Sequence, residues 1–246
     1  MGLSIAMKIN FPLLALAVGA FAIGTTEFSP MGFLPEIAND LSVSIPQAGL
    51  LISAYAVGVM IGAPLMTLWL ARFPKKTALI LLMAIFTIGN VAATVAPDYM
   101  SLMGARLITS LNHGAFFGLG SVVAASVVPK DKQASAVAMM FMGLTIANIG
   151  GVPLATWLSQ NTSWRMAFAA ISILGIMTML ALWKALPQDH DVVKPNVAKG
   201  LRVLTRAPVV LALLTTVMSA AQCLRYIPTL LRAYTYLCRH HRKPSP

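Results

Sequence analysis

Three residues that can carry charge or bind a proton lie inside long apolar runs of this sequence. Glu27 is the only charged residue between Phe11 and Leu34. Arg106 and His113 lie in a later apolar run, seven positions apart, and therefore share one face of a helix. Ionisable residues within an apolar span typically mark a path for protons or substrate, so we expect such a path here. The alternative is a structural ion pair between Glu27 and Arg106.

The overall composition indicates that these apolar runs belong to a membrane protein. Hydrophobic residues make up 58% of the chain and charged residues 10%, with a mean hydropathy of +0.78. These values lie far outside the usage of soluble globular proteins. A helix rises about 1.5 Å per residue, so the run from Phe11 to Leu34 can cross a hydrocarbon core of about 30 Å. It is too long for a signal peptide, and it contains an acid.

Six apolar runs of this kind follow one another along the chain, at residues 11–34, 47–70, 78–97, 100–128, 134–158 and 166–186. They predict an all-α membrane protein whose residues 1–187 form a six-helix transmembrane bundle. A charged segment at 188–206 separates this bundle from a further apolar run that begins near Ala207. Arg225 and Arg232 interrupt this last run, so we expect residues 207–246 to contain an incomplete seventh helix and a basic tail.

The distribution of basic residues predicts the orientation of the bundle in the membrane. Arginine and lysine gather in alternate connections, whereas the other connections hold only Arg165. Because Lys and Arg favour the cytoplasmic side, we expect the amino terminus and residues 188–206 in the cytoplasm and residues 35–46 outside. The expected location is the inner (plasma) membrane. The lipid bilayer is then the first partner of this chain.

Several other classes of function find no support in the sequence. The net charge of +11 is spread over separate loops and forms no basic face interleaved with aromatic residues, so we expect no nucleic-acid partner. Cys223 and Cys238 have no metal-ligand spacing, and we expect neither a metal site nor a cofactor. No H-E-x-x-H motif and no Ser/His/Asp set at a common depth occurs, so no catalytic residues are expected and the chain is not predicted to be an enzyme.

Counting along the helices places the polar residues at different depths. Glu27 and Arg106 are both expected about 12 Å below the outer surface, and His113 about 10 Å deeper, near the midplane. His113 and its neighbour Asn112 are candidates for lining a substrate cavity, as is Asn148 in the fifth run. A packing role with internal hydrogen bonds remains the alternative for His113.

The fifth run also contains residues that favour a bend. Gly143, Gly150, Gly151 and Pro153 belong to the stretch GLTIANIGGVP. Proline removes a backbone donor and glycine permits close approach, so a bend is expected near Gly151. A bend that gates transport and a static kink are both compatible with this pattern.

Four stretches together resemble the major facilitator superfamily, in its drug/proton antiporter and arabinose-efflux-permease branch. They are GTTEFSPMGFLPEIA, ARLITSLNHGAFFG, GLTIANIGGVP and SWRMAF, within a similar region from about Asn10 to Ser219. The resemblance implies a proton-driven exporter of a small molecule, in which Glu27 accepts the proton and Arg106 is the arginine of the fourth span. It also implies that the glycines and Pro153 form the antiporter-type kink.

The loop between the second and third runs departs from the family pattern. Where the superfamily usually has G-x-x-x-D-R-x-G-R-R, this chain keeps the basic residues Arg72, Lys75 and Lys76 but has Ala71 in place of the acid. The resemblance implies that this loop contributes to cytoplasmic gating. Loss of the acid is expected to weaken that contact.

The resemblance also implies a second six-helix half, because such transporters bind substrate between two halves. From Ala221 onward the chain reads AQCLRYIPTLLRAYTYLCRHHRKPSP, which is strongly basic. Our hypothesis is that a frameshift ends an amino-terminal half, leaving a truncated and inactive form whose missing partner is the carboxy-terminal half. A non-transporting membrane half that pairs with another half, or persists as a remnant, is the alternative. The substrate of the transporter stays open among a sugar, a nucleoside and a drug-like molecule.

Overall fold

The computed structural model describes residues 10–187 and residue 211, and all structural statements below concern these residues. The chain divides into two compact units, Met1–Lys194 and Pro195–Pro246, and only residue 211 of the second is described. The predictions for 188–206 and 207–246 therefore lie outside the described residues, apart from that position. Every regular element of the described part is helical.

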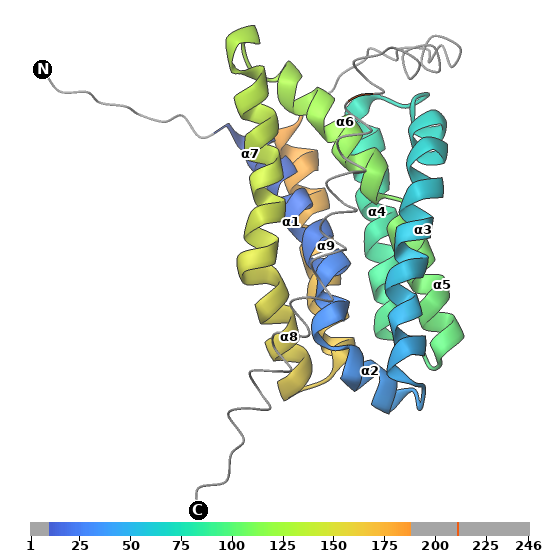
Figure 1. Ribbon diagram of the computed structural model, residues 1–246. Coiled ribbons are helices and arrows are strands. Elements are labelled where there is room, and N and C mark those ends of the chain that lie inside the picture. Colours follow the sequence, from blue (N-terminus) through green and yellow to red (C-terminus); the bar gives the residue numbers. More distant parts are fainter. Residues whose placement is uncertain (1–9, 188–210, 212–246) are drawn as a thin grey trace, which may run out of the picture. The chain divides into compact units, whose positions relative to one another are not determined.

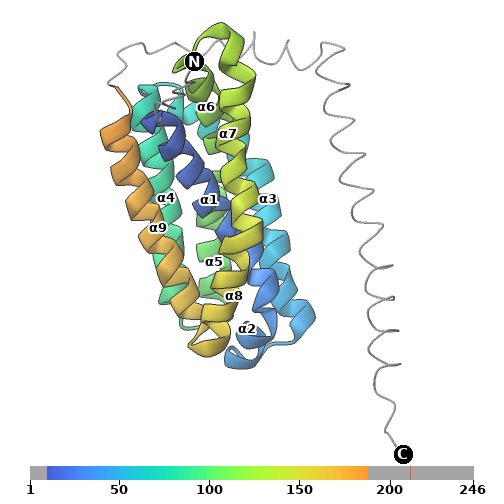
Figure 2. The same cartoon turned by 90° about the vertical axis from the view of Figure 1, so that its left-hand side faces the viewer.

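The helices run along a common direction and are joined by short connections (Figures 1 and 2). In chain order they are α1 (Phe11–Gly32), α2 (Leu34–Asp40), α3 (Ile45–Leu70), α4 (Lys75–Thr94), α5 (Tyr99–Ser110), α6 (His113–Ser126), the 3-10 turn η1 (Lys130–Lys132), α7 (Gln133–Ile146), the π-helical turn η2 (Ala147–Gly151), α8 (Val152–Asn161) and α9 (Trp164–Ala185). Six helical segments of the described part are long and apolar enough to cross a membrane, which confirms the six predicted spans.

Two details of these spans were not part of the sequence-based prediction. The polar connection after the first span contains a short helix, α2, over Leu34–Asp40. Pro35 in its first turn favours a helix start, and Ile37 is fully buried against the core. The fourth span was expected to be one helix, but it is interrupted at Leu111 and Asn112, between α5 and α6.

The interruption of the fourth span coincides with a very close approach of α3. A Cβ atom on Gly62 would lie 2.8 Å from the Cα atom of Leu111, and one on Gly58 would overlap the side chain of Ser110. These two glycines therefore allow α3 to pack directly against the break. The close contact positions the side chains of α3 next to those that begin α6.

Helix α1 occupies the centre of the packing and contacts α7, α9, α8, α6, η2 and α3 (Figure 1). Its buried residues Leu16, Ala20 and Ile23 belong to an apolar core shared with α4, α6, α7 and α9. A second core surrounds Phe33 and Phe168, whose rings meet edge to face at 5.7 Å. Because α1 contacts so many helices, a polar residue on it has neighbours on several sides.

The end of the bundle that carries α2, at the bottom of Figure 1, is held together by a polar cluster that we call the outer cluster. It consists of Asp40, Trp164, Arg165 and the carbonyl of Ala96. Asp40 forms an ion pair with Arg165 and accepts a hydrogen bond from the indole of Trp164 at 3.0 Å. Arg165 also donates to the Ala96 carbonyl at 2.9 Å. The outer cluster thus joins α2, the connection between α4 and α5, and the start of α9.

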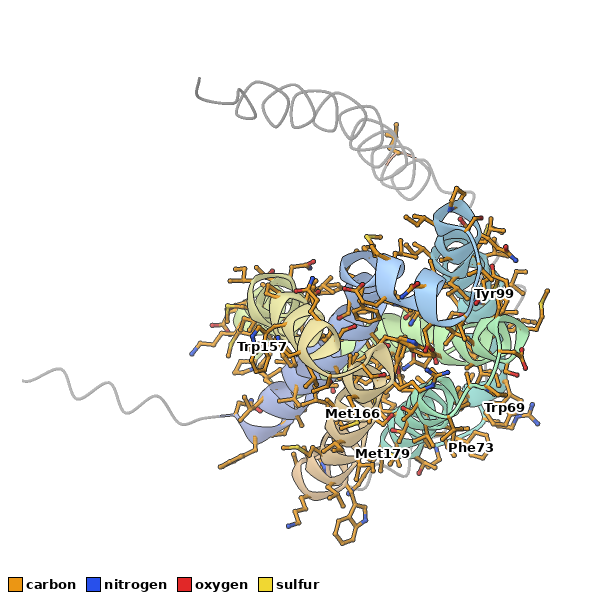
Figure 3. The ribbon with its side chains drawn as sticks, turned by 90° about the horizontal axis from the view of Figure 1, so that it is seen from below. Trp69, Phe73, Tyr99, Trp157, Met166 and Met179 are labelled. Carbon is orange, nitrogen blue, oxygen red and sulfur yellow. The ribbon has the colours of Figure 1, made fainter. Side chains whose placement is uncertain are left out.

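The bundle exposes large apolar side chains over its outer surface (Figure 3). Met60 is 69% exposed, Trp157 61% and Ile149 76%. In water such extensive apolar exposure would favour association, whereas lipid tails or a protein partner would cover it. The exposed surface is therefore consistent with a membrane-embedded helical unit.

Candidate functional site

Arg106 of α5 is buried at the side of α1 that carries Glu27, with only 1% of its surface exposed. Its Nη1 atom donates to the Thr26 carbonyl at 2.9 Å and approaches the Thr26 hydroxyl at 3.4 Å. Its guanidinium also lies over the ring of Tyr55, 4.2 Å from the ring centre. Arg106 therefore lies level with Thr26, one residue before the Glu27 position that the helix counting gave.

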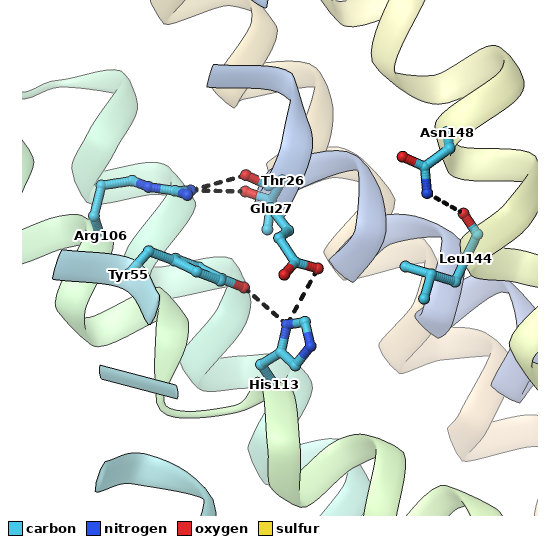
Figure 4. A network of polar contacts seen from close by, with 7 residues as sticks. All are labelled: Thr26, Glu27, Tyr55, Arg106, His113, Leu144 and Asn148. Atoms are coloured by element: carbon cyan, nitrogen blue, oxygen red, sulfur yellow. Dashed lines mark hydrogen bonds and ion pairs between the residues drawn. The ribbon is translucent and has the colours of Figure 1, made fainter. Parts of the chain in front are cut away.

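Glu27 is the one carboxylate of the described residues that lies inside the bundle rather than near its ends. Its side chain is 28% exposed, and its Oε2 atom is 3.8 Å from Nδ1 of His113 (Figure 4). Among the described residues, Arg106 makes no direct ion pair with Glu27. The direct structural pair that the sequence left open is thus absent from this arrangement, and the imidazole is the nearer partner.

His113, the first residue of α6, connects Glu27 to Tyr55 of α3. The Tyr55 hydroxyl is 3.2 Å from Nδ1 of His113, and both polar groups point toward the imidazole in Figure 4. The His113 ring also packs against Phe117, with ring centres 5.0 Å apart, and Phe117 stacks on Phe141 of α7. His113 therefore makes both polar contacts, which fit a role in a cavity, and an aromatic contact, which fits a role in packing.

Several buried polar atoms near this arrangement have no hydrogen-bond partner among the described residues. They are Nε and Nη2 of Arg106, and both side-chain polar atoms of Asn112. Unpaired polar groups in a low-dielectric interior are costly. Asn112 is fully buried, so it does not line an open cavity here.

We call Glu27, Tyr55, Arg106 and His113 the inner cluster.

Asn148, the third cavity candidate, lies apart from the inner cluster. It belongs to the π-helical turn η2, is exposed, and donates to the carbonyl of Leu144 at 3.0 Å (Figure 4). Its amide is thus bonded within its own helix. The structure brings Glu27 and His113 together but leaves Asn148 on the surface.

The region of the fifth span where the sequence predicts a bend contains η2, a wide turn from Ala147 to Gly151, and Pro153 lies two residues after this turn. The glycines differ in their surroundings. A Cβ atom on Gly143 would overlap the carbonyl of Ala17, and one on Gly151 would overlap Thr25, both in α1. Gly150 has open space around it. Gly143 and Gly151 therefore permit close packing of this span on α1.

The basic loop between α3 and α4 lies at the opposite end from the outer cluster. Arg72 donates to the carbonyl of Trp69 at 2.9 Å, within its own turn. Lys76 donates to the carbonyl of Leu186 at 2.7 Å and so links α4 to the end of α9. Lys75 borders a pocket of about 180 Å³ that is lined by residues of α3, α4 and α6.

Sequence reasoning missed two residues that contact the site. Tyr55 lies in an uninterrupted apolar run, and only its hydroxyl distinguishes it from other apolar residues there. Thr26 supplies the carbonyl to Arg106, and its hydroxyl donates to Asn90 of α4 at 2.6 Å. A search for every hydroxyl or amide at the depth of Glu27 would have found both.

The six spans and the polar cluster between them define a helical membrane unit of the kind that forms half of a transporter. The family model described as Major Facilitator Superfamily matches residues 16–237, and the chain belongs to this family, whose members are transporters rather than enzymes.

The chain is 63% identical over 233 residues to the "Inner membrane transport protein YdhP" of Escherichia coli (strain K12), covering 94% of this chain and 60% of that protein. It is 31% identical to the "Probable sugar efflux transporter" of Pasteurella multocida (strain Pm70), covering 71% of this chain and 43% of that protein. This chain therefore spans 60% or less of the length of these relatives.

The solved structures support the fold. The chain is similar to the xylose transporter XylE from E. coli in its partially occluded inward open conformation, with a TM-score of 0.59 and 18% identity. The similarity covers 72% of this chain and 48% of that one. At this identity the likeness concerns the helical architecture alone.

Proposed function

We propose that this chain forms one half of a proton-coupled secondary transporter that exports a small molecule across the inner membrane. The carrying observation is the position of Glu27, which lies inside the bundle, 28% exposed, 3.8 Å from an imidazole and one residue after Thr26, whose carbonyl binds a buried guanidinium. A carboxylate that is open to solvent and balanced between such neighbours can take up a proton on one side and release it on the other. The name of the E. coli relative supports the inner membrane as the location.

Transport in this proposal requires a second six-helix half. Transporters of this fold bind substrate near the midplane, between two halves that rock against each other. The additional length of the relatives is sufficient for such a half. Without a second half, the polar face around His113 would lie against lipid. Each unsatisfied polar group there would cost roughly several kcal/mol.

The substrate class stays within a sugar, a nucleoside or a drug-like molecule. The printed name of the Pasteurella relative, a probable sugar efflux transporter, favours a sugar. Export rather than import is supported by the same name and by the antiporter-like motifs of α1 and of the fifth span. The competing function is a non-transporting membrane half.

The test compares Glu27→Gln with the unchanged chain, each co-expressed with the carboxy-terminal half of the E. coli relative in inside-out vesicles. L-arabinose, uridine and ethidium serve as probes of the three substrate classes, and proton release is followed with a pH-sensitive dye. We expect Glu27→Gln to abolish probe-dependent proton release while insertion is unchanged. Asp131→Asn, at an exposed carboxylate of η1, is the matched control.

Two results would contradict the proposal. Undiminished proton-driven flux in the Glu27→Gln variant would remove this carboxylate from the mechanism. Saturable, gradient-dependent flux by the 246-residue chain without a second half would show that the chain is sufficient by itself.

A further inference from the structure

The inner cluster contains one atom with two competing neighbours, Nδ1 of His113. The Tyr55 hydroxyl lies 3.2 Å from it, within hydrogen-bond distance, and Oε2 of Glu27 lies 3.8 Å from it, just beyond that distance. An imidazole nitrogen has either one lone pair or one proton, so it forms one good hydrogen bond at a time. Tyr55 and Glu27 therefore compete for the same atom.

The protonation state of Glu27 determines whether Glu27 or Tyr55 is hydrogen-bonded to Nδ1 of His113. An ionised carboxylate only accepts hydrogen bonds, and charge-assisted bonds are about twice as strong as neutral ones. Ionised Glu27 therefore draws a proton onto Nδ1 and takes its hydrogen bond. When Glu27 is uncharged, no charge-assisted bond holds Nδ1, and the Tyr55 hydroxyl, at 3.2 Å, is nearer to Nδ1 than the acid oxygen at 3.8 Å. Tyr55 can then donate to Nδ1, provided that the ring proton is on Nε2.

The remaining contacts of Tyr55 carry this change to other helices. Tyr55 belongs to α3 and is only 3% exposed, and its ring lies on the guanidinium of Arg106 in α5. That guanidinium has two unpartnered nitrogen atoms among the described residues, Nε and Nη2, so it can respond to a nearby negative charge. A change of partner at Nδ1 thus alters the contacts that α3 makes with α5 and α6.

No other ionisable side chain of the elements packed on α1 competes for this position. In α3, α5 and α6 the titratable residues are Tyr55, Tyr99, Arg106 and His113, while α7, η2 and α8 contain none. Helix α4, which packs on α6, has Lys75 and Lys76 in its first turn, at one end of the bundle. Arg165 and Lys184 of α9 lie near the two ends of that helix, and Arg165 is paired with Asp40. The competition is therefore confined to the inner cluster.

We propose that His113 is a positioning residue that couples the charge of Glu27 to the contact between α3 and α6. This inference rests on the proposed function and adds a residue to it. The imidazole keeps one ring proton throughout and moves it between Nε2 and Nδ1 by exchange with solvent, since 16% of its side chain is exposed. Only Glu27 gains or loses a proton, so the proton count of the cycle stays at one.

The experiment is nitrogen NMR of the 246-residue chain in lipid nanodiscs with 15N-labelled histidine. The sequence has 4 histidines, and the signal lost in His113→Asn identifies His113. We expect the Nδ1 signal of His113 to shift with pH in the unchanged chain and to stay at its low-pH position in Glu27→Gln, which mimics the uncharged acid. Asp131→Asn is the matched carboxylate control and should follow the unchanged chain.

A second variant separates positioning from packing. Tyr55→Phe keeps the ring on Arg106 but removes the competing hydroxyl, so its Nδ1 signal is expected to move toward the high-pH position at every pH. A His113 signal that is independent of pH, or that shifts equally in Glu27→Gln, would overturn the inference. Because this measurement needs no flux, it fails or succeeds independently of the transport assay.

Discussion

The outer cluster and the inner cluster each contain an acid and an arginine, but the two arginines are bonded differently. In the outer cluster Arg165 pairs directly with Asp40, and both also bond to other groups. In the inner cluster Arg106 bonds to a backbone carbonyl of the segment that carries the acid, and two of its nitrogen atoms have no described partner. A satisfied polar network fixes one arrangement, whereas an incompletely satisfied one has alternatives to adopt.

This difference predicts that the two clusters contribute oppositely to stability and function. Asp40 and Arg165 are partly exposed and stabilise the end of the bundle modestly. Arg106 is a buried charge with two nitrogen atoms that have no hydrogen-bond partner among the described residues, so it lowers the free energy of unfolding. Residues that destabilise a fold in this way are expected at functional sites.

The largest expected effect is that of Arg106→Leu on proton coupling. We expect complete loss of probe-dependent proton release in the two-half vesicle assay, because Glu27 loses the positive charge that favours its ionised form. The free energy of unfolding in mixed micelles should stay the same or rise, since an incompletely bonded buried charge is replaced by an apolar side chain. A decrease of more than about 2 kcal/mol would show that Arg106 is a structural residue like Arg165.

A second large effect is expected where the fifth span packs on α1, the helix that carries Glu27. Gly143→Ala would place a methyl group on the carbonyl of Ala17, so α1 and α7 must separate, at a cost of about 1–3 kcal/mol. Gly150→Ala has open space and should not destabilise the fold, because alanine favours a helix over glycine by about 0.5–1 kcal/mol. Equal effects of the two substitutions in thermal unfolding would contradict the close packing described here.

A smaller effect is expected in the outer cluster, from Asp40→Asn. The substitution removes the ion pair with Arg165 but leaves an oxygen that can accept from Trp164. Because the side chains of Arg165 and Asp40 are 31% and 47% exposed, we expect a loss of only about 0.5–1 kcal/mol of unfolding free energy and unchanged proton coupling. Loss of coupling in this variant would remove the distinction between the two clusters.

The smallest effect concerns the pH dependence of the same variant. Hydrogen bonds from Arg165 and Trp164 hold the pKa of Asp40 below its usual value. Asp40 therefore stabilises the fold above about pH 4, and this contribution is lost as the pH falls through the folded-state pKa. The difference in unfolding free energy between the unchanged chain and Asp40→Asn should be constant from neutral pH to about pH 4 and shrink below it. A constant difference at all pH values would contradict the ionised pair.

Much of the fold was predictable because long apolar runs dominate the sequence. The six spans are confirmed. Helix counting placed Arg106 at the depth of Glu27, and Arg106 bonds to the carbonyl of Thr26, the residue before it. The break at Leu111 was not predicted, because it depends on how closely Gly58 and Gly62 let α3 approach, a tertiary contact that no local pattern records.

The candidate site was predictable only in part, for a related reason. The unusual residues, an acid, an arginine and a histidine in apolar runs, stand out in any sequence. Which of them touch is decided by side-chain directions over a few ångströms, so the choice of His113 over Arg106 as the nearer partner of Glu27 required coordinates. Tyr55 was missed because its hydroxyl is its only polar feature. The roles assigned to all these residues stay predictions.

The wide turn η2 has a consequence for comparing this chain with others. A π-helical turn is equivalent to one extra residue inserted into an α-helix, and one residue corresponds to a rotation of about 100°. Helix α8 is therefore turned relative to the direction that α7 alone would set, which gives Ser159 a buried position and Trp157 an exposed one. An ungapped alignment to a relative without this turn would pair every residue after Gly151 with a neighbour about 100° away around the helix, and deletion of one residue from Ala147–Gly151 would rotate the α8 side chains by the same angle in this chain.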